Sequence, residues 1–132
     1  MAAGRVSALG RSHQDAFTGL VVDTRNARLV VYRKPGTDFD SALARLAPGV
    51  PIDLRDAPRS IGELAATRGQ VEALMGKTTG YTFVTVGDGS ELSFGQGVVE
   101  VGVAGDLAQA KRDLGARFGD RVTVSAAEIP VG

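Results

Sequence analysis

The feature that most constrains the fold of this chain is an internal repeat in the order of its short hydrophobic segments. Residues 17–23 and 81–87 both begin with an aromatic residue and threonine and continue into β-branched residues, a pattern typical of strands. Matching segments follow each of them in the same order: a second strand (29–33 and 97–101), a helix start (36–39 and 104–107) and a third strand (49–54 and 119–124). The sequence therefore predicts two units, each ordered strand, strand, helix, strand.

The order of the elements predicts the sheet topology. A hairpin makes its two strands antiparallel, whereas a strand–helix–strand connection within one sheet makes them parallel. We therefore expect an α+β protein with two ββαβ units, each a small mixed sheet with a helix on one face, joined by a central helix. The two sheets could form separate lobes or merge into one curved layer, and the pattern leaves both open.

A central helix is predicted between the units. Ser60-Ile61-Gly62-Glu63 has the Ser-x-x-Glu spacing of a capping box, and an apolar stripe follows at helical spacing up to Met75. Gly76 suits the end of this helix. The predicted organisation is a flexible N-terminal segment (1–16), a first unit (17–58), a linking helix (60–76), a second unit (80–126) and an extended tail (127–132).

Composition narrows the function classes. Fifteen basic residues balance fifteen acidic ones, which argues against a large nucleic-acid-binding surface because such surfaces need many unopposed cations. The absence of cysteine excludes disulfides, thiolate catalysis and cysteine-ligated zinc. No apolar run is long enough for a membrane span, and residues 1–16 contain none of signal-peptide length. Whether residues 1–16 are native or follow a removed targeting segment stays open.

Glycine is unusually frequent, with 18 of 132 residues against about 7% in average proteins. Most of these glycines mark the predicted boundaries of elements. Gly76-Lys77-Thr78-Thr79 is similar to the end of a phosphate-binding loop, but Val71 stands where the first glycine belongs, so we interpret it as a helix stop. The glycine-rich stretch 87–97 is interpreted as a hairpin loop. Gly102 lies inside a predicted strand, which indicates a bulge or a close backbone contact.

Candidate catalytic residues are few. His13 is the single histidine, and it lies in the polar N-terminal stretch without a carboxylate partner in the sequence. Asp38 and Asp40 fall in the first turn of a predicted helix, where the helix dipole favours carboxylates, so we interpret them as helix-stabilising and not as metal ligands. We predict no catalytic residue, no metal site and no cofactor.

Two segments carry a resemblance to a known family. The run Phe17-Thr18-Gly19-Leu20-Val21-Val22-Asp23, followed by Asn26 and Leu29-Val30-Val31, resembles strand pairs in the prosegments of actinobacterial secreted serine proteases of the streptogrisin and alpha-lytic type. Ser60-Ile61-Gly62-Glu63-Leu64, opening a helix before a second hairpin unit, is similar to the same layout. The resemblance covers roughly residues 16–126 and follows the order of elements more than identity. The second hairpin lacks the Asp and Asn of the first.

The resemblance implies a function. Such prosegments act as folding catalysts and tight inhibitors, and they bind through a sheet and a C-terminal tail that enters the protease cleft. By analogy, the partner-binding residues here are Glu128, Ile129, Pro130, Val131 and Gly132. We therefore expect a non-catalytic protein-binding module, a stand-alone relative that chaperones or inhibits a protein partner such as a serine protease, in a secreted or envelope-associated setting. The alternatives are a small enzyme or small-molecule binder with a pocket between sheet and helices, or a structural cell-envelope domain.

Overall fold

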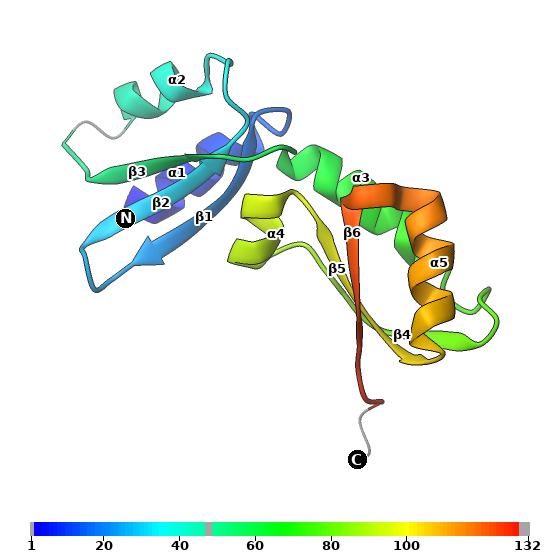
Figure 1. The fold of residues 1–132 in the computed structure, drawn as a ribbon. Helices are drawn as coiled ribbons and strands as arrows, with labels where there is room; N and C mark the ends of the chain where they lie inside the picture. Colours follow the sequence, from blue (N-terminus) through cyan, green and yellow to red (C-terminus); the bar gives the residue numbers. More distant parts are fainter. Residues whose placement is uncertain (1, 47–48, 130–132) are drawn as a thin grey trace.

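The computed structural model describes residues 2–46 and 49–129, and it shows the predicted plan of two similar units (Figure 1). The elements of the first unit are α1 (Ala2–Arg11), β1 (Phe17–Asp23), β2 (Arg28–Arg33), α2 (Phe39–Leu46) and β3 (Ile52–Asp56). Helix α3 (Ile61–Glu72) follows. The elements of the second unit are β4 (Tyr81–Gly87), α4 (Glu91–Gln96), β5 (Val99–Gly105), α5 (Leu107–Phe118), a single 3-10 turn (Gly119–Arg121) and β6 (Val122–Ala126).

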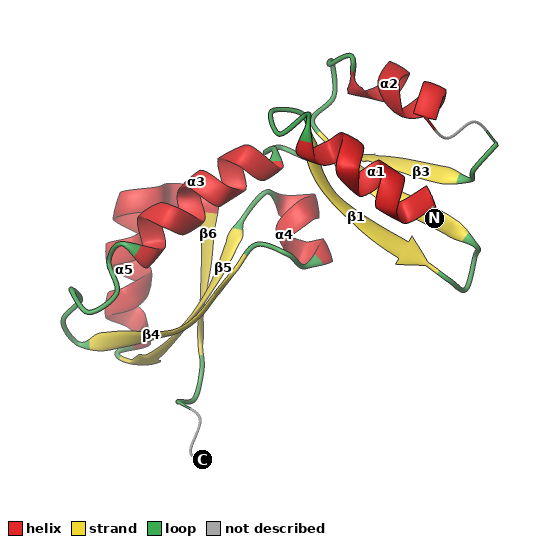
Figure 2. Ribbon diagram, turned by 180° about the vertical axis from the view of Figure 1, so that it is seen from behind, coloured by secondary structure: helices red, strands yellow, loops and turns green. Residues whose placement is uncertain are grey.

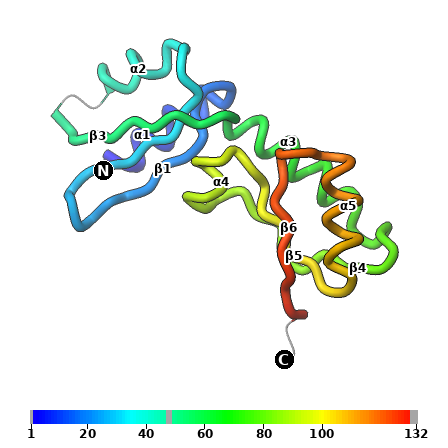
Figure 3. Tube along the Cα trace, in the orientation of Figure 1, coloured from blue at the N-terminus to red at the C-terminus, as the bar shows by residue number. Residues whose placement is uncertain are grey.

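The α+β class and the two ββαβ units are confirmed. The strands form two separate sheets, which we call sheet A (order β1-β2-β3) and sheet B (order β4-β5-β6). In both sheets the hairpin pair is antiparallel and the pair joined across a helix is parallel. The alternative of one continuous curved layer is therefore wrong, and the tube in Figure 3 shows the chain leaving the first unit through α3 to reach the second.

Two helices cover one face of sheet A. Phe39 and Leu43 of α2 and Val6 of α1 lie in one buried cluster with Leu29 and Val31 of β2. The expectation of a flexible segment is thus wrong for residues 2–11, which form α1 across the sheet (Figure 2). The physical reason is a short apolar stripe, Ala2, Val6 and Leu9, whose spacing places all three side chains on the face that packs against this cluster.

Sheet B is covered on one face by α3 and α5. Its core contains Leu64 and Val71 of α3, Leu114 of α5 and the alternating valines of β5. Ile61, at the start of α3, instead packs against the core of the first unit. A single helix therefore contributes to both cores.

The start of the linking helix forms as predicted. Ser60 Oγ accepts a hydrogen bond from the Glu63 amide at 3.2 Å, and Glu63 Oε1 accepts one from the Ser60 amide at 3.2 Å, so the capping box is confirmed. The regular helix ends at Glu72, and Gly76 then turns the chain with φ 77°. Lys77 is exposed, which confirms that this glycine–lysine stretch is a helix stop.

The hairpin of the second unit differs from the prediction of a plain loop. Residues Glu91–Gln96 form helix α4, which begins where Ser90 Oγ accepts a hydrogen bond from the Ser93 amide at 3.0 Å and ends at Gly97 in the left-handed conformation. Phe94 stabilises this helix because its ring packs 5.7 Å from the ring of Tyr32 on sheet A. A Cβ at Gly19 would lie 2.5 Å from the Phe94 ring, so only glycine leaves room for it. Figure 1 shows α4 between the two units.

Candidate protein-binding edge

Four strands lie at the edges of the two sheets, β1 and β3 in sheet A and β4 and β6 in sheet B. An edge strand exposes unpaired N–H and C=O groups that can pair with another chain. Proteins commonly protect such strands with charged side chains or with bulges that interrupt the regular pattern. The four edges of this protein differ in how far they are protected.

Strand β3 is protected by charge. Asp53, Arg55 and Asp56 account for three of its five residues. Asp56 Oδ1 accepts a hydrogen bond of 2.6 Å from Arg33 Nη1, and Arg33 also donates to both carboxylate oxygens of Asp40. These bonds raise the pKa of Arg33, the contact with Asp40 contributing most. The carboxylate of Asp40, in the first turn of α2, is therefore bonded to Arg33 of sheet A.

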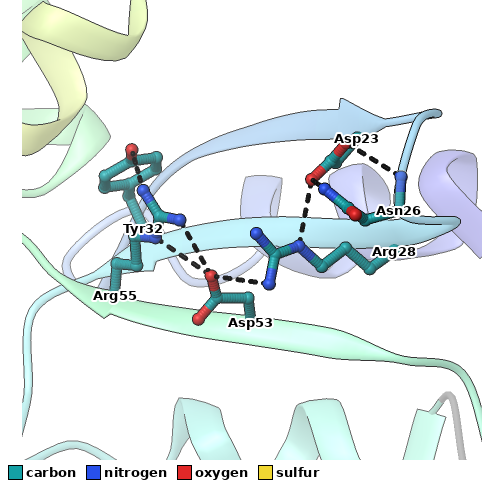
Figure 4. Close-up of polar contacts among 6 residues, drawn as sticks. All are labelled: Asp23, Asn26, Arg28, Tyr32, Asp53 and Arg55. Atoms are coloured by element: carbon teal, nitrogen blue, oxygen red, sulfur yellow. Dashed lines mark hydrogen bonds and ion pairs between the residues drawn. The ribbon is translucent and has the colours of Figure 1, made fainter.

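A row of charged side chains extends this protection across the face of sheet A that the helices α1 and α2 leave open (Figure 4). We call this row the charge ladder, and its members are Asp23, Arg28, Asp53 and Arg55. Asp53 Oδ2 accepts hydrogen bonds from Arg55 Nε and Nη2 at 3.1 and 2.9 Å and lies 3.5 Å from Arg28 Nη1. Arg28 Nε in turn donates to Asp23 Oδ2 at 3.0 Å. The pKa of Asp23 is lowered, chiefly by the hydrogen bond from the Asn26 side chain and further by Arg28. Asp23, Asn26 and Arg28 thus tie the predicted first hairpin together.

Strands β1 and β4 carry bulges. The register of β1 shifts between Phe17 and Gly19, and that of β4 shifts between Phe83 and Thr85. A bulge leaves one residue unpaired and increases the local twist, which makes regular pairing with another strand harder. Strand β1 in addition ends on the charged Asp23.

Strand β6 has neither kind of protection. Its residues, Val122–Ala126, include no charged side chain, and its register with β5 runs without a shift. Among the four edge strands in the described part of the chain, β6 is therefore the one best suited to accept a further strand.

The direction of the free backbone groups follows from one contact. The Ala127 amide donates to the Val103 carbonyl of β5 at 2.8 Å. Successive residues of a strand direct their N–H groups to opposite edges. The N–H groups of Thr123 and Ser125 therefore also point toward β5, and the N–H groups of Val124 and Ala126 point to the free edge. The same relation holds in the first unit, where the Ala57 amide donates to the Arg33 carbonyl at 2.9 Å.

The predicted partner-binding residues follow β6 directly. Glu128 and Ile129 continue the chain in irregular, non-helical backbone, and the side chain of Ile129 is 59% exposed. Pro130, Val131 and Gly132 lie outside the described residues. Figure 1 shows the described part of the chain leaving the end of sheet B after β6. The first two predicted residues thus lie just after the unprotected strand in the chain, separated from it by Ala127.

The side chains on the open face of sheet B next to β6 are small and polar. A Cβ at Gly102 would collide with Thr85 Oγ1 and would lie 2.9 Å from Ala127 Cβ. The close neighbours of this glycine are therefore side chains and not the predicted backbone, and the predicted bulge lies opposite it, between Phe83 and Thr85 of β4. Glu100 on the same strand accepts hydrogen bonds from the hydroxyls of Ser90 and Ser93. Glu100 therefore holds the start of α4 in place.

The other residues considered for catalysis have structural partners. His13 lies with its ring 5.7 Å from that of Phe39, and its Nδ1 is 3.1 Å from the Leu9 carbonyl. Within the described residues, no group of three or more histidine, aspartate or glutamate side chains is arranged to hold a metal ion. Sequence reasoning missed the contrast between the four edges, because bulges and pairing partners are set by tertiary structure and not by local pattern.

Comparisons with known proteins give no relative: no family model matches the chain, and no significant similarity to a curated protein or a solved structure was found. Among the residues that the structure describes, no helix has the length and apolar character needed to cross a membrane.

Proposed function

We propose that this protein is a non-catalytic protein-binding domain that offers the free edge of β6 and the following segment to a protein partner, with a secreted serine protease as the partner class that the prosegment resemblance implies. The observation that carries the proposal is the contrast between β6, regular and uncharged, and the three protected edges. Strand addition at such an edge supplies main-chain hydrogen bonds, and flanking side chains supply specificity. Ile129, exposed just beyond β6, is suited to enter a partner's pocket.

The sharpest test removes one outward hydrogen-bond donor. Ala126→Pro deletes an N–H that faces the free edge while leaving the Ala127–Val103 bond in place, because proline lacks only its own amide hydrogen. The expected result is loss of partner binding by about tenfold or more, since a lost hydrogen bond is accompanied by a steric block at the docking edge. Binding is measured as inhibition of a purified streptogrisin-type protease cleaving a chromogenic peptide.

The matched control is Asp56→Pro, at the corresponding position of β3. This residue also precedes an alanine whose amide pairs with the neighbouring strand, and it also faces a free edge. Its carboxylate is 77% exposed, so the loss of its ion pair with Arg33 has a small effect on stability. We expect Asp56→Pro to inhibit as well as the unmodified protein.

Two outcomes would count against the proposal in different ways. If the unmodified protein inhibits no protease of this class, the protease is the wrong partner. In that case proteins retained on the immobilised chain are compared with those retained on the two variants. If Ala126→Pro and Asp56→Pro retain the same proteins as the unmodified chain, β6 is not the binding edge and the proposal is wrong.

A further inference from the structure

A groove at the junction of the two units is separate from the β6 edge. It has a volume of about 370 Å³ and is bounded by α1, β1, the start of α3, the 88–89 loop and α4. Its apolar walls come from Phe17, Leu20, Ile61 and Phe94. Cavities of this size at the boundary between two structural units are common sites for small ligands.

Two charged side chains line this junction groove, and only one of them has an ion-pair partner. Asp88 lines it, but its carboxylate is already paired with Arg68 Nη1 at 3.1 Å. Arg11, at the end of α1, also lines the groove and forms no ion pair with any carboxylate among the described residues. The rim therefore presents one uncompensated positive charge beside an apolar wall.

We propose that the junction groove binds a small amphiphilic carboxylate, with its carboxylate group at Arg11 and its hydrocarbon part against Phe17, Leu20 and Phe94. The guanidinium group is suited to this because it can donate two parallel hydrogen bonds to the two oxygens of a carboxylate. Ser7, on the same face of α1 as Arg11, adds a hydroxyl to the rim. An apolar wall with a few convergent polar groups is the usual composition of a ligand site.

The test uses decanoate below its micelle concentration, compared with decanol, which has the same chain and no charge. Amide shifts in the NMR spectrum of the ¹⁵N-labelled chain report where each compound binds. We expect decanoate to produce saturable shifts at Leu20, Ile61 and Gly89, and decanol to bind about tenfold more weakly, because a charge-assisted hydrogen bond is lost.

Three variants make the result specific to Arg11. Arg11→Gln should weaken decanoate binding by about tenfold, and Arg11→Lys should restore most of it because the charge is kept. Arg45→Gln is the matched control: Arg45 is also an exposed arginine in the last turn of a helix, but it lies on α2 and outside the groove. It should bind as the unmodified protein does. Equal binding of decanoate and decanol, equal effects of the two glutamine variants, or shifts away from the groove would each overturn the inference.

Discussion

The two units share one topology but differ in what covers their open faces and edges. In the first unit, the open face of sheet A carries the charge ladder and receives Phe94 from α4, and β3 is charged along its length. In the second unit, the open face of sheet B is small and polar, and β6 is regular and uncharged. The first unit is therefore closed by contacts within the chain, whereas the second keeps an edge strand, β6, with neither charge nor bulge, which is the strand that we propose as the binding edge.

Hydrogen bonds through the segment before α3 join the two units. Arg59, just before α3, donates to the Gly97 carbonyl at 2.7 Å and to Asp120 Oδ1 at 2.9 Å. Thr18 Oγ1 donates to the Arg59 carbonyl at 2.6 Å, so this connecting segment is bonded to both units. Together with Phe94 and Ile61, these contacts lead us to expect one cooperative unfolding transition.

The largest expected loss of stability comes from substitutions in the two hydrophobic cores. Leu114→Ala in α5 and Leu43→Ala in α2 remove buried side chains, 0% and 2% exposed. Each should lower the free energy of unfolding by about 2–5 kcal/mol. Urea denaturation followed by the NMR signals of Tyr32, in the first unit, and Tyr81, in the second, measures both.

The same experiment can separate the units. If they unfold together, either variant moves both tyrosine signals to the same lower urea midpoint. If Leu43→Ala moves the Tyr32 signal and leaves that of Tyr81 at its original midpoint, the units are independent and the cooperative interpretation is wrong.

A smaller effect is expected at the contact between α4 and sheet A. Gly19→Ala places a methyl group where the Phe94 ring lies and should lower the free energy of unfolding by about 1–3 kcal/mol. The control is Gly69→Ala in the exposed part of α3, where a Cβ meets nothing within 4 Å. That substitution should raise stability by about 0.5–1 kcal/mol because alanine is the better helix former. Thermal denaturation of the two variants gives opposite shifts if Phe94 closes sheet A as described.

The smallest effect concerns the ion pair that joins α3 to the first unit. Lys34 Nζ donates to Glu63 Oε1 at 2.7 Å, and this bond, followed by those from Ser60, lowers the pKa of Glu63 from its ordinary value of 4.5. A lowered pKa means that the unfolded chain takes up the proton first, so the stabilisation is present above pH 4.5 and is lost as the pH falls through the lowered value.

Glu63→Gln tests this directly. Both side chains are partly exposed, so the variant should be less stable than the unmodified protein by about 0.2–1 kcal/mol at pH 7. The difference should shrink as the pH is lowered below 4.5, as measured by urea denaturation at several pH values. A difference that stays constant down to pH 3 would show that Glu63 acts through its capping geometry and not through its charge.

Much of the fold was predictable because its signals are local. The repeated aromatic–threonine strands, the capping box at Ser60 and the helix stop at Gly76 each depend on neighbouring residues alone. Helix α1 was missed because its apolar stripe is short and gains stability only when it packs against sheet A and α2, in the cluster that contains Val31 and Phe39. Helix α4 was missed because Phe94 is directed to Gly19 and Tyr32, residues far away in the sequence.

The candidate site was predictable only in part, for a related reason. The segment beginning at Glu128 was singled out through a resemblance, and the uncharged composition of β6 can be read from the sequence. That β6 is an edge strand in unbroken register, while β4 is interrupted, depends on how distant strands pair. The junction groove at Arg11 likewise requires α1, α3 and α4 to be brought together.

The position of α4 has a consequence for the chain while it is being made. Sheet A is complete in sequence once Asp56 has been added, but Phe94, which covers Tyr32, is synthesised later. At ribosomal rates of about 5–20 residues per second, the interval amounts to roughly 2–8 s. During that time Val30 and Tyr32 of the nascent first unit lack the cover of Phe94, and the ladder of Arg28, Asp53 and Arg55 keeps charged groups beside them.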